Sequence, residues 1–241
     1  MKRTDGRAHN EMRPVILKPG FMPNAEGSCL VEMGGTKVIC TATVEETVPR
    51  WMHGKGLGWV TAEYSMLPRS SSQRIPREVS KGRVSGRTQE IQRLIGRSLR
   101  AVTDLTILGQ RSILIDCDVL QADGGTRTAS ITGGYVALAL AIRGLRSNEK
   151  LPSDPLHTSV AAISVGILDE VALLDLKYDE DSNAEVDMNV VMTGTDKFVE
   201  VQGTAEKGVF ERDRLDTMID LAISGIKDLT KLQLEAVGSG G

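Results

Sequence analysis

The sequence predicts an α+β fold with mixed, largely antiparallel sheets. Strand-like and helix-like segments follow one another irregularly, without the strict β-α-β order of a parallel α/β fold. Several pairs of strand-like segments are joined by short glycine-containing turns, which is typical of antiparallel hairpins. The chain has 241 residues, of which 40% are hydrophobic, so it can bury the core of one large domain or of two small ones. No low-complexity linker divides it.

The N-terminal half contains three predicted strands and one predicted helix. Residues 28–33 and 36–44 are strand-like and flank a Gly-Gly turn at 34–35, which predicts a hairpin. A third strand is expected over residues 59–66. Apolar side chains recur at helical spacing over residues 87–102, and the predicted buried stripe consists of Ile91, Leu94, Ile95, Leu99 and Val102.

The C-terminal half begins with an apolar strand over residues 113–120, a Gly-Gly turn, and a helix of small residues from about Thr128 to Ala141. A loop that contains two prolines follows. The next expected strands cover residues 159–167, 171–176, 187–192 and 198–202. A last helix is expected from about Glu211, and the Gly-Ser-Gly-Gly tail at 238–241 is expected to be flexible.

The turn between the apolar strand and the small-residue helix has the composition of a phosphate site. Gly124 and Gly125 let the backbone approach a ligand closely, and the N–H groups of the following helix point outward with the positive end of its dipole behind them. Thr126 adds a hydroxyl donor, and Arg127 adds a planar fork for phosphate oxygens. The motif is neither a Walker loop nor a dinucleotide fingerprint. The alternative is a plain strand-to-helix turn with a surface arginine.

Positive charge is concentrated in one stretch of an otherwise acidic chain. The whole sequence carries a net charge of −3, whereas residues 67–100 hold nine basic and two acidic residues, a net of +7. This favours contact with a polyphosphate backbone, and the absence of aromatic residues there argues against base stacking by this stretch. The alternative is a solvated arginine-rich surface. A mobile loop is expected to carry Arg69, Arg74 and Arg77, and the first turn of the next helix is expected to carry Arg87.

An acidic cluster lies late in the chain. Residues 169–187 contain eight carboxylates and one lysine, and most of these carboxylates are expected to be solvated. Asp187 differs because it opens a strand, where it shares a face with Asn189. Mg²⁺ needs only one or two carboxylates besides waters and substrate oxygens, and Asp181 and Asp187 would supply that pair if the loop between them folds back. Spacing alone does not show that it does.

Cysteine content and the chain start indicate a cytoplasmic protein without a membrane partner. The three cysteines are an odd number without paired spacing, which predicts neither a disulfide framework nor a zinc site. The first residues lack the apolar region of a signal peptide, and no apolar stretch was expected to approach the length of a membrane span.

Together these segments resemble the RNase PH family of phosphate-dependent tRNA 3′-exonucleases. The resemblance runs from about residue 13 to residue 206, and it is carried by residues 31–38, 58–64, 86–93, 116–133, 180–182, 187–192 and 200–206. It implies a single domain, over residues 1–237, with a split left-handed β-α-β element. It also implies that six copies form a ring as a trimer of dimers.

The resemblance also implies roles for individual residues. The inorganic phosphate would be held by Arg87, Gly125, Thr126 and Arg127. The metal-binding catalytic pair would be Asp181 and Asp187, with Arg127 also counted among the catalytic residues. The loop that contacts tRNA would do so through Arg69, Arg74 and Arg77. The implied co-substrate is inorganic phosphate, and the implied cofactor is Mg²⁺ or another divalent cation.

The implied activity is phosphorolytic 3′-to-5′ trimming of tRNA precursors and other structured RNA, with release of nucleoside diphosphates. The reverse reaction would add nucleotides. Two other classes stay open. A catalytically inactive RNA-binding ring subunit would lack the phosphate arginines or the aspartates, and this chain has both. A metal-dependent hydrolytic nuclease would use water and would leave Arg87 and Arg127 without a role.

Overall fold

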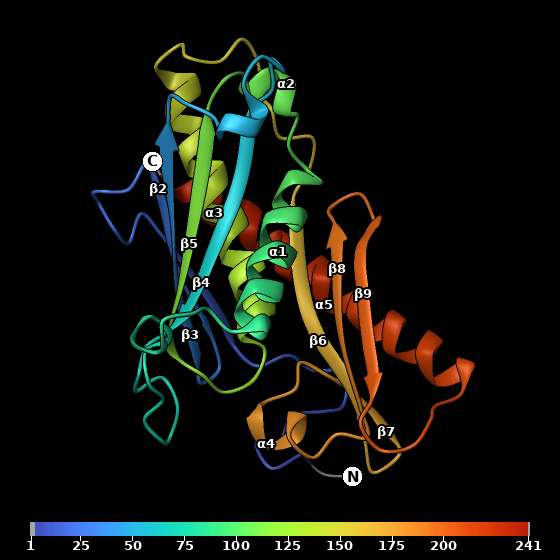
Figure 1. Ribbon diagram of the computed structural model, residues 1–241. Helices are drawn as coiled ribbons and strands as arrows, with labels where there is room; N and C mark the ends of the chain where they lie inside the picture. The colour runs from blue at the N-terminus through green and yellow to red at the C-terminus, as the bar shows by residue number, and fades with distance from the viewer. Residues whose placement is uncertain (1–2, 241) are drawn as a thin grey trace.

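The computed structural model describes residues 3–240, apart from the side chains of Val79 and Lys81. Its first sheet has the strand order β1-β2-β3-β5-β4 and occupies the blue-to-green side of the molecule (Figure 1). All neighbours in this sheet are antiparallel except β4 and β5, which are parallel and are connected through a helix. The five strands are β1 (Val15–Pro19), β2 (Gly27–Met33), β3 (Thr36–Glu45), β4 (Trp59–Met66) and β5 (Ser112–Gln121).

The second sheet is antiparallel throughout and has the strand order β7-β6-β8-β9. Its strands are β6 (Val160–Leu168), β7 (Val171–Leu174), β8 (Val186–Thr193) and β9 (Phe198–Ala205). β8 is buried almost throughout because β6 and β9 flank it, whereas β9 forms an exposed edge. The predicted mixed and largely antiparallel α+β class is confirmed.

Five α-helices connect and cover the sheets. They are α1 (Gly86–Arg100), α2 (Leu105–Leu108), α3 (Thr126–Ser147), α4 (Tyr178–Asp181) and α5 (Arg212–Ser239), and two short 3₁₀ turns lie at Arg50–Met52 and Glu78–Lys81. The apolar stripe predicted for α1 is buried against β4 and α3. Ser85 caps this helix by accepting a hydrogen bond from the Thr88 N–H at 3.2 Å.

Helix α3 is the common core of both sheets. It packs against β2 and β3 of the first sheet and against β6 of the second (Figure 1). Glycine is needed at Gly133, because a Cβ there would lie 2.1 Å from Val31 of the first sheet. By length and composition, this helix could span a membrane. This corrects the expectation that no apolar stretch approaches the length of a membrane span. However, 83% of its most apolar window is buried inside the protein, as in a core helix.

The structure adds elements that the sequence patterns did not predict. β1, α2 and α4 were missed, α3 runs over Thr126–Ser147 rather than from Thr128 to Ala141, and β7 ends at Leu174 rather than at residue 176. β1 is a five-residue edge strand that ends at a proline, and α4 is a single turn of four residues, so neither repeats a pattern often enough to be recognised. α5 continues to Ser239, so two of the four residues expected in the tail are helical, and Gly241 lies outside the described residues.

Candidate active site

A cavity of about 320 Å³ lies where the β5–α3 turn, which has the composition of a phosphate site, meets the end of the second sheet that carries Asp181 and Asp187. Its lining comes from the end of β4 and the loop after it, the start of α1, the β5–α3 turn, β6, α4 and β8. The six residues to which the family resemblance gave a phosphate or metal role line it together, although they lie as far as 100 residues apart, and these are Arg87, Gly125, Thr126, Arg127, Asp181 and Asp187.

The β5–α3 turn has the backbone that its two glycines predict. Gly124 and Gly125 have φ values of +76° and +66°, a region that side-chain-bearing residues rarely adopt. Gly125 occupies the N-cap position of α3, and no side chain accepts a hydrogen bond there. The first N–H groups of the helix are therefore available to an anion in the cavity, with the helix dipole behind them.

Gly124 also allows the second sheet to approach this turn. A Cβ at this position would lie 2.5 Å from the carbonyl oxygen of Leu176 and 2.9 Å from the backbone nitrogen of Tyr178. The Tyr178 N–H donates to Asp123 Oδ1 across the same contact, at 3.3 Å. Because residue 124 is glycine, the segment that leads into α4 can pack directly on the β5–α3 turn.

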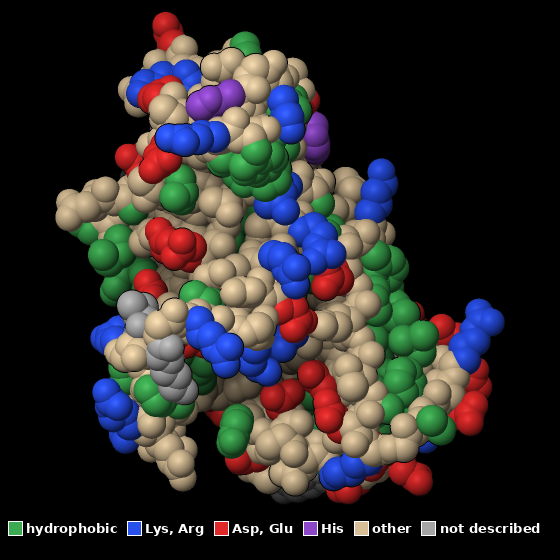
Figure 2. All heavy atoms as spheres, viewed as in Figure 1, with side chains coloured by type: hydrophobic (Ala, Val, Ile, Leu, Met, Phe, Trp, Pro, Cys, Tyr) green, Lys and Arg blue, Asp and Glu red, His purple; other side chains and the backbone are tan. Residues whose placement is uncertain are grey.

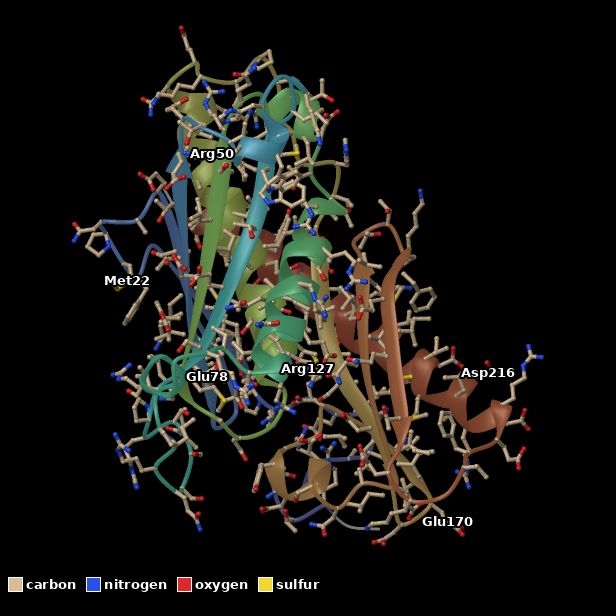
Figure 3. The ribbon with its side chains drawn as sticks, viewed as in Figure 1. Met22, Arg50, Glu78, Arg127, Glu170 and Asp216 are labelled. Atoms are coloured by element: carbon tan, nitrogen blue, oxygen red, sulfur yellow. The ribbon has the colours of Figure 1, made fainter. Side chains whose placement is uncertain are left out.

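Side chains of three other elements orient Thr126 and Arg127. The hydroxyl of Tyr64, at the end of β4, lies 2.8 Å from the Thr126 hydroxyl. Arg127 Nη1 donates to Gln202 Oε1 at 2.9 Å, and Gln202 Nε2 donates to Glu90 Oε1 at 2.7 Å. Figure 3 shows Arg127 beside the lower turn of α1, between the two sheets. This chain of contacts holds the guanidinium at the wall of the cavity.

Asp181 and Asp187 form one electrostatic pair. Burial raises the pKa of Asp187 to about 6, and the nearby Asp181 carboxylate adds to this shift, while Arg127 and Arg87 oppose it. Burial also raises the pKa of Asp181, against the influence of Arg87 and Arg127. Asp187 Oδ1 is buried and has no hydrogen-bond partner within residues 3–240. The pair therefore combines buried negative charge with an unsatisfied oxygen.

Two buried arginine–carboxylate pairs hold the segment that contains Asp175 and Glu180 against the rest of the protein, beside the cavity. Arg3 contacts Glu180 of α4 through Nε to Oε1 at 2.8 Å and Nη2 to Oε2 at 2.6 Å. Arg13 contacts Asp175 in the same two-pronged way, at 2.8 and 2.7 Å, and also donates to the carbonyl oxygen of Asp123. Arg13 thereby ties the β5–α3 turn to the segment before α4. Asp181 and Asp187 line the same cavity, so the loop between them folds back as their pairing requires.

The three loop arginines lie outside the cavity lining. Arg69, Arg74 and Arg77 are exposed on the segment between β4 and α1, and this segment contributes Ser71 and Ser72 to the cavity instead. Figure 2 shows Lys and Arg side chains gathered beside a hollow that contains acidic ones. Asp116 and Asp118 lie on β5 and are not among the lining residues.

Sequence patterns missed the residues that support the site. Tyr64, Glu90 and Gln202 fall within the segments that carry the family resemblance, but nothing in their spacing indicates that they converge on one loop. Arg3 and Arg13 lie more than 160 residues from their partners. Pairing over such a distance has no periodic signal in a single sequence.

Comparisons with known proteins identify the family of the chain. The chain matches the model of the 3′ exoribonuclease family in two parts, domain 1 over residues 11–143 and domain 2 over residues 158–225. It is 56% identical over 238 residues to Ribonuclease PH of Moorella thermoacetica, an alignment that covers 99% of this chain and 95% of that protein.

Solved structures share the fold at low sequence identity. Rice Rrp46 superposes with a TM-score of 0.78 at 17% identity, covering 98% of this chain and all of that one. A chain of the Archaeoglobus fulgidus exosome with RNA bound to the active site superposes with a TM-score of 0.81 at 21% identity, covering 95% and 92%. The family models and the bacterial relative, together with this common fold, establish that the chain belongs to the RNase PH family of phosphorolytic 3′ exoribonucleases.

Proposed function

We propose that the protein trims the 3′ ends of tRNA precursors and other structured RNA in this cavity, with inorganic phosphate as the nucleophile. Family membership makes the chain a phosphorolytic 3′-to-5′ exoribonuclease. The observation that carries the proposal is the convergence of an anion-binding helix start, two arginines and two buried carboxylates on one cavity. These are the groups that a reaction between two phosphate anions requires.

The proposed reaction exchanges a phosphodiester bond for a phosphoanhydride bond. An oxygen of inorganic phosphate attacks the phosphorus of the last phosphodiester, and the bond from that phosphorus to the 3′ oxygen of the preceding nucleotide breaks. The terminal nucleotide leaves as a nucleoside 5′-diphosphate, and the shortened RNA takes a proton at its new 3′ hydroxyl. Because the bonds broken and formed are similar in energy, nucleoside diphosphates would also extend RNA in the reverse direction.

The protein's contribution is positioning and charge neutralisation. Arg87 and Arg127 reduce the repulsion between the two anions, and Gly125 and Thr126 hold the nucleophile at the start of α3. Arg127 is aimed by Gln202, so little reorganisation is needed when phosphate binds. No covalent intermediate with the chain is required, as in other phosphoryl transfers.

Asp181 and Asp187 fit a divalent cation such as Mg²⁺. Burial raises the pKa values of both carboxyls although Arg87 and Arg127 oppose this shift, and one buried oxygen of Asp187 has no hydrogen-bond partner within the described residues, so a bound cation would complete the site. A pair of carboxylates is what Mg²⁺ takes when substrate oxygens and waters complete its shell. When bound, the cation would neutralise charge on the scissile phosphate and the leaving oxygen. In our proposal these two aspartates hold it.

We extend the proposal to the partners of the molecule. The exposed Arg69, Arg74 and Arg77 would contact phosphates on the body of a tRNA. The chain would act as a single domain in a homohexameric ring, a trimer of dimers. The exposed Phe198 and Val201 on the edge strand β9 offer an apolar surface for subunit contact. A cytoplasmic location fits the three free, buried cysteines.

The test is RNA digestion with and without inorganic phosphate, with the products identified. The proposal predicts shortening only with phosphate and release of nucleoside diphosphates. Nucleoside monophosphates formed without phosphate would identify a hydrolase instead. RNA binding without any shortening under either condition would identify an inactive ring subunit.

A further inference from the structure

Tyr178 is an exposed aromatic residue in the cavity to which the reaction gives no role. It begins α4 three residues before Asp181, and its side chain is 60% exposed, whereas Tyr64 and Tyr135 are buried. Within the described part of the chain it is the one aromatic residue among those that line the cavity. Its ring and hydroxyl have no hydrogen bond or ring contact within residues 3–240.

The charged groups of the cavity do not contact the nucleobase of the RNA substrate in the proposed reaction. Arg87, Arg127 and the start of α3 suit phosphate oxygens, and Asp181 and Asp187 suit a cation. None of these groups offers a flat apolar surface to a nucleobase. An exonuclease that removes one nucleotide after another meets all four bases at the same position, so hydrogen bonds specific to one base would hinder it. Stacking on an aromatic ring accepts every base.

The backbone of Tyr178 is held firmly although its side chain is free. Its N–H donates to Asp123 Oδ1 at 3.3 Å, and the preceding Lys177 N–H donates to Glu180 Oε2 at 3.1 Å. Glu180 is itself fixed by Arg3. Because the backbone is already fixed, only the side-chain torsions of the ring lose conformational freedom when a ligand packs on it. Its backbone also abuts Gly124, next to the proposed phosphate site.

We propose that Tyr178 forms a nucleobase subsite, in which its ring stacks on the base of the 3′-terminal nucleotide of the RNA. This inference rests on the proposed function, because the base that stacks on Tyr178 belongs to the nucleotide whose phosphate is attacked in the proposed reaction. Stacking at this point places the terminal nucleotide between the ring and the phosphate loop. The subsite selects neither purine nor pyrimidine by hydrogen bonding, and the tyrosine hydroxyl takes no part in it.

The test combines a residue change with a base change. Wild type, Tyr178→Ala and Tyr178→Phe are compared on a short oligoribonucleotide that has either a normal or an abasic 3′-terminal nucleotide, with kcat/KM for the first phosphorolysis measured. We expect wild type and Tyr178→Phe to use the abasic substrate about tenfold less well, the fold-change of one stacking contact. Tyr178→Ala is expected to use both substrates equally, at about the rate of wild type on the abasic one.

Controls separate stacking from a general disturbance of the site. Phe21→Ala removes an aromatic residue that is 49% exposed and lies outside the cavity lining, and it should behave as wild type. An oligonucleotide that is abasic four positions from its end should not distinguish Tyr178→Ala from wild type. If Tyr178→Ala slows both 3′-terminal substrates equally while keeping the tenfold preference, or matches wild type on both, the subsite does not exist. A wild-type protein inactive on normal RNA would refute the proposed function instead.

Discussion

Asp187 shows how the environment of one residue defines the chemistry of the site. Its side chain shares the cavity with Arg127, but Arg127 is engaged by Gln202, and one oxygen of Asp187 remains unpaired within the described residues. Burial of a carboxylate without a partner costs free energy, which the raised pKa expresses. A buried carboxylate that is unfavourable by itself and would become favourable beside a cation is suited, in our proposal, to holding one.

Arg127→Ala is expected to abolish phosphate-dependent shortening while RNA binding remains close to wild type. Arg127 contacts the nucleophile in our account, whereas a long RNA is held mainly outside the cavity. Loss of a donor aimed at a reacting phosphate lowers kcat by about 10² to 10³. Arg93→Ala removes an exposed arginine of α1 that does not line the cavity, and it serves as the matched control. Digestion by Arg127→Ala at the wild-type rate would remove the phosphate site from this loop.

Asp187→Asn is expected to lose activity and to gain thermal stability in metal-free buffer at pH 7.5. The folded pKa of about 6 lies above the ordinary value of 3.8, so the folded state retains a proton that the unfolded state loses. The contribution of this group to stability therefore falls as the pH rises from about 3.8 to about 6, and asparagine removes that loss. Thermal denaturation with EDTA and with Mg²⁺ measures both effects. A metal-free variant less stable than wild type, or equal stabilisation of both proteins by Mg²⁺, would contradict this account.

Among the elements, α4 depends most on distant partners. It has only four residues, too few to be stable by itself, and Arg3 and Arg13 hold it and its approach in place. The N-terminal segment therefore determines where Asp181 lies. The site is built by an ion-pair scaffold as much as by the sheets.

Asp175→Asn is expected to destabilise the protein by about 3 to 5 kcal/mol and to reduce activity, because it leaves Arg13 buried without its main counter-charge. Asparagine tolerates the positive φ of this residue, 54°, so the effect reports the lost charge rather than backbone strain. Chemical denaturation measures the change. Asp179→Asn, at a carboxylate whose side chain is 73% exposed on α4, should leave stability unchanged. Equal stability of the two variants would show that the buried pair does not hold the loop.

The sequence predicted most elements but not their assembly. Long periodic segments such as residues 87–102 and 113–120 were recognised because each repeats its pattern several times. The turn at Gly124 and Gly125 was recognised from glycine alone and has the expected positive φ values. The position of Asp181 relative to Asp187 depends on ion pairs formed with the first 13 residues. Tertiary contacts of that kind leave no trace in local composition.

At the scale of the whole molecule, positive charge is concentrated in one segment of the chain. The stretch from residue 67 to residue 100 is basic, and the remainder of the chain is acidic. The candidate cavity lies at the boundary between this basic segment and the acidic residues of α4 and β8. An RNA approaching this molecule is thus attracted toward the side on which its 3′ end would react.

Replacement of Arg69, Arg74 and Arg77 together by alanine is expected to weaken tRNA binding far more than it slows attack on a short oligonucleotide. The three side chains are exposed, so folding should be unaffected. Each lost phosphate contact lowers the slope of log K against log salt by about 0.7 to 0.9. A salt titration of tRNA binding compares the variant with wild type. An unchanged slope would show that tRNA is held elsewhere.

The most direct measurement of the central claim follows the nucleophile itself. Purified protein is incubated with a short RNA, Mg²⁺ and isotopically labelled inorganic phosphate, and the released nucleotides are separated. The account predicts that the label appears in the β-phosphate of nucleoside diphosphates, in a one-to-one ratio with nucleotides removed. It further predicts that Arg127→Ala abolishes this incorporation. Unlabelled nucleoside monophosphates as the product would show that water is the nucleophile, and the phosphate site described here would then be contradicted.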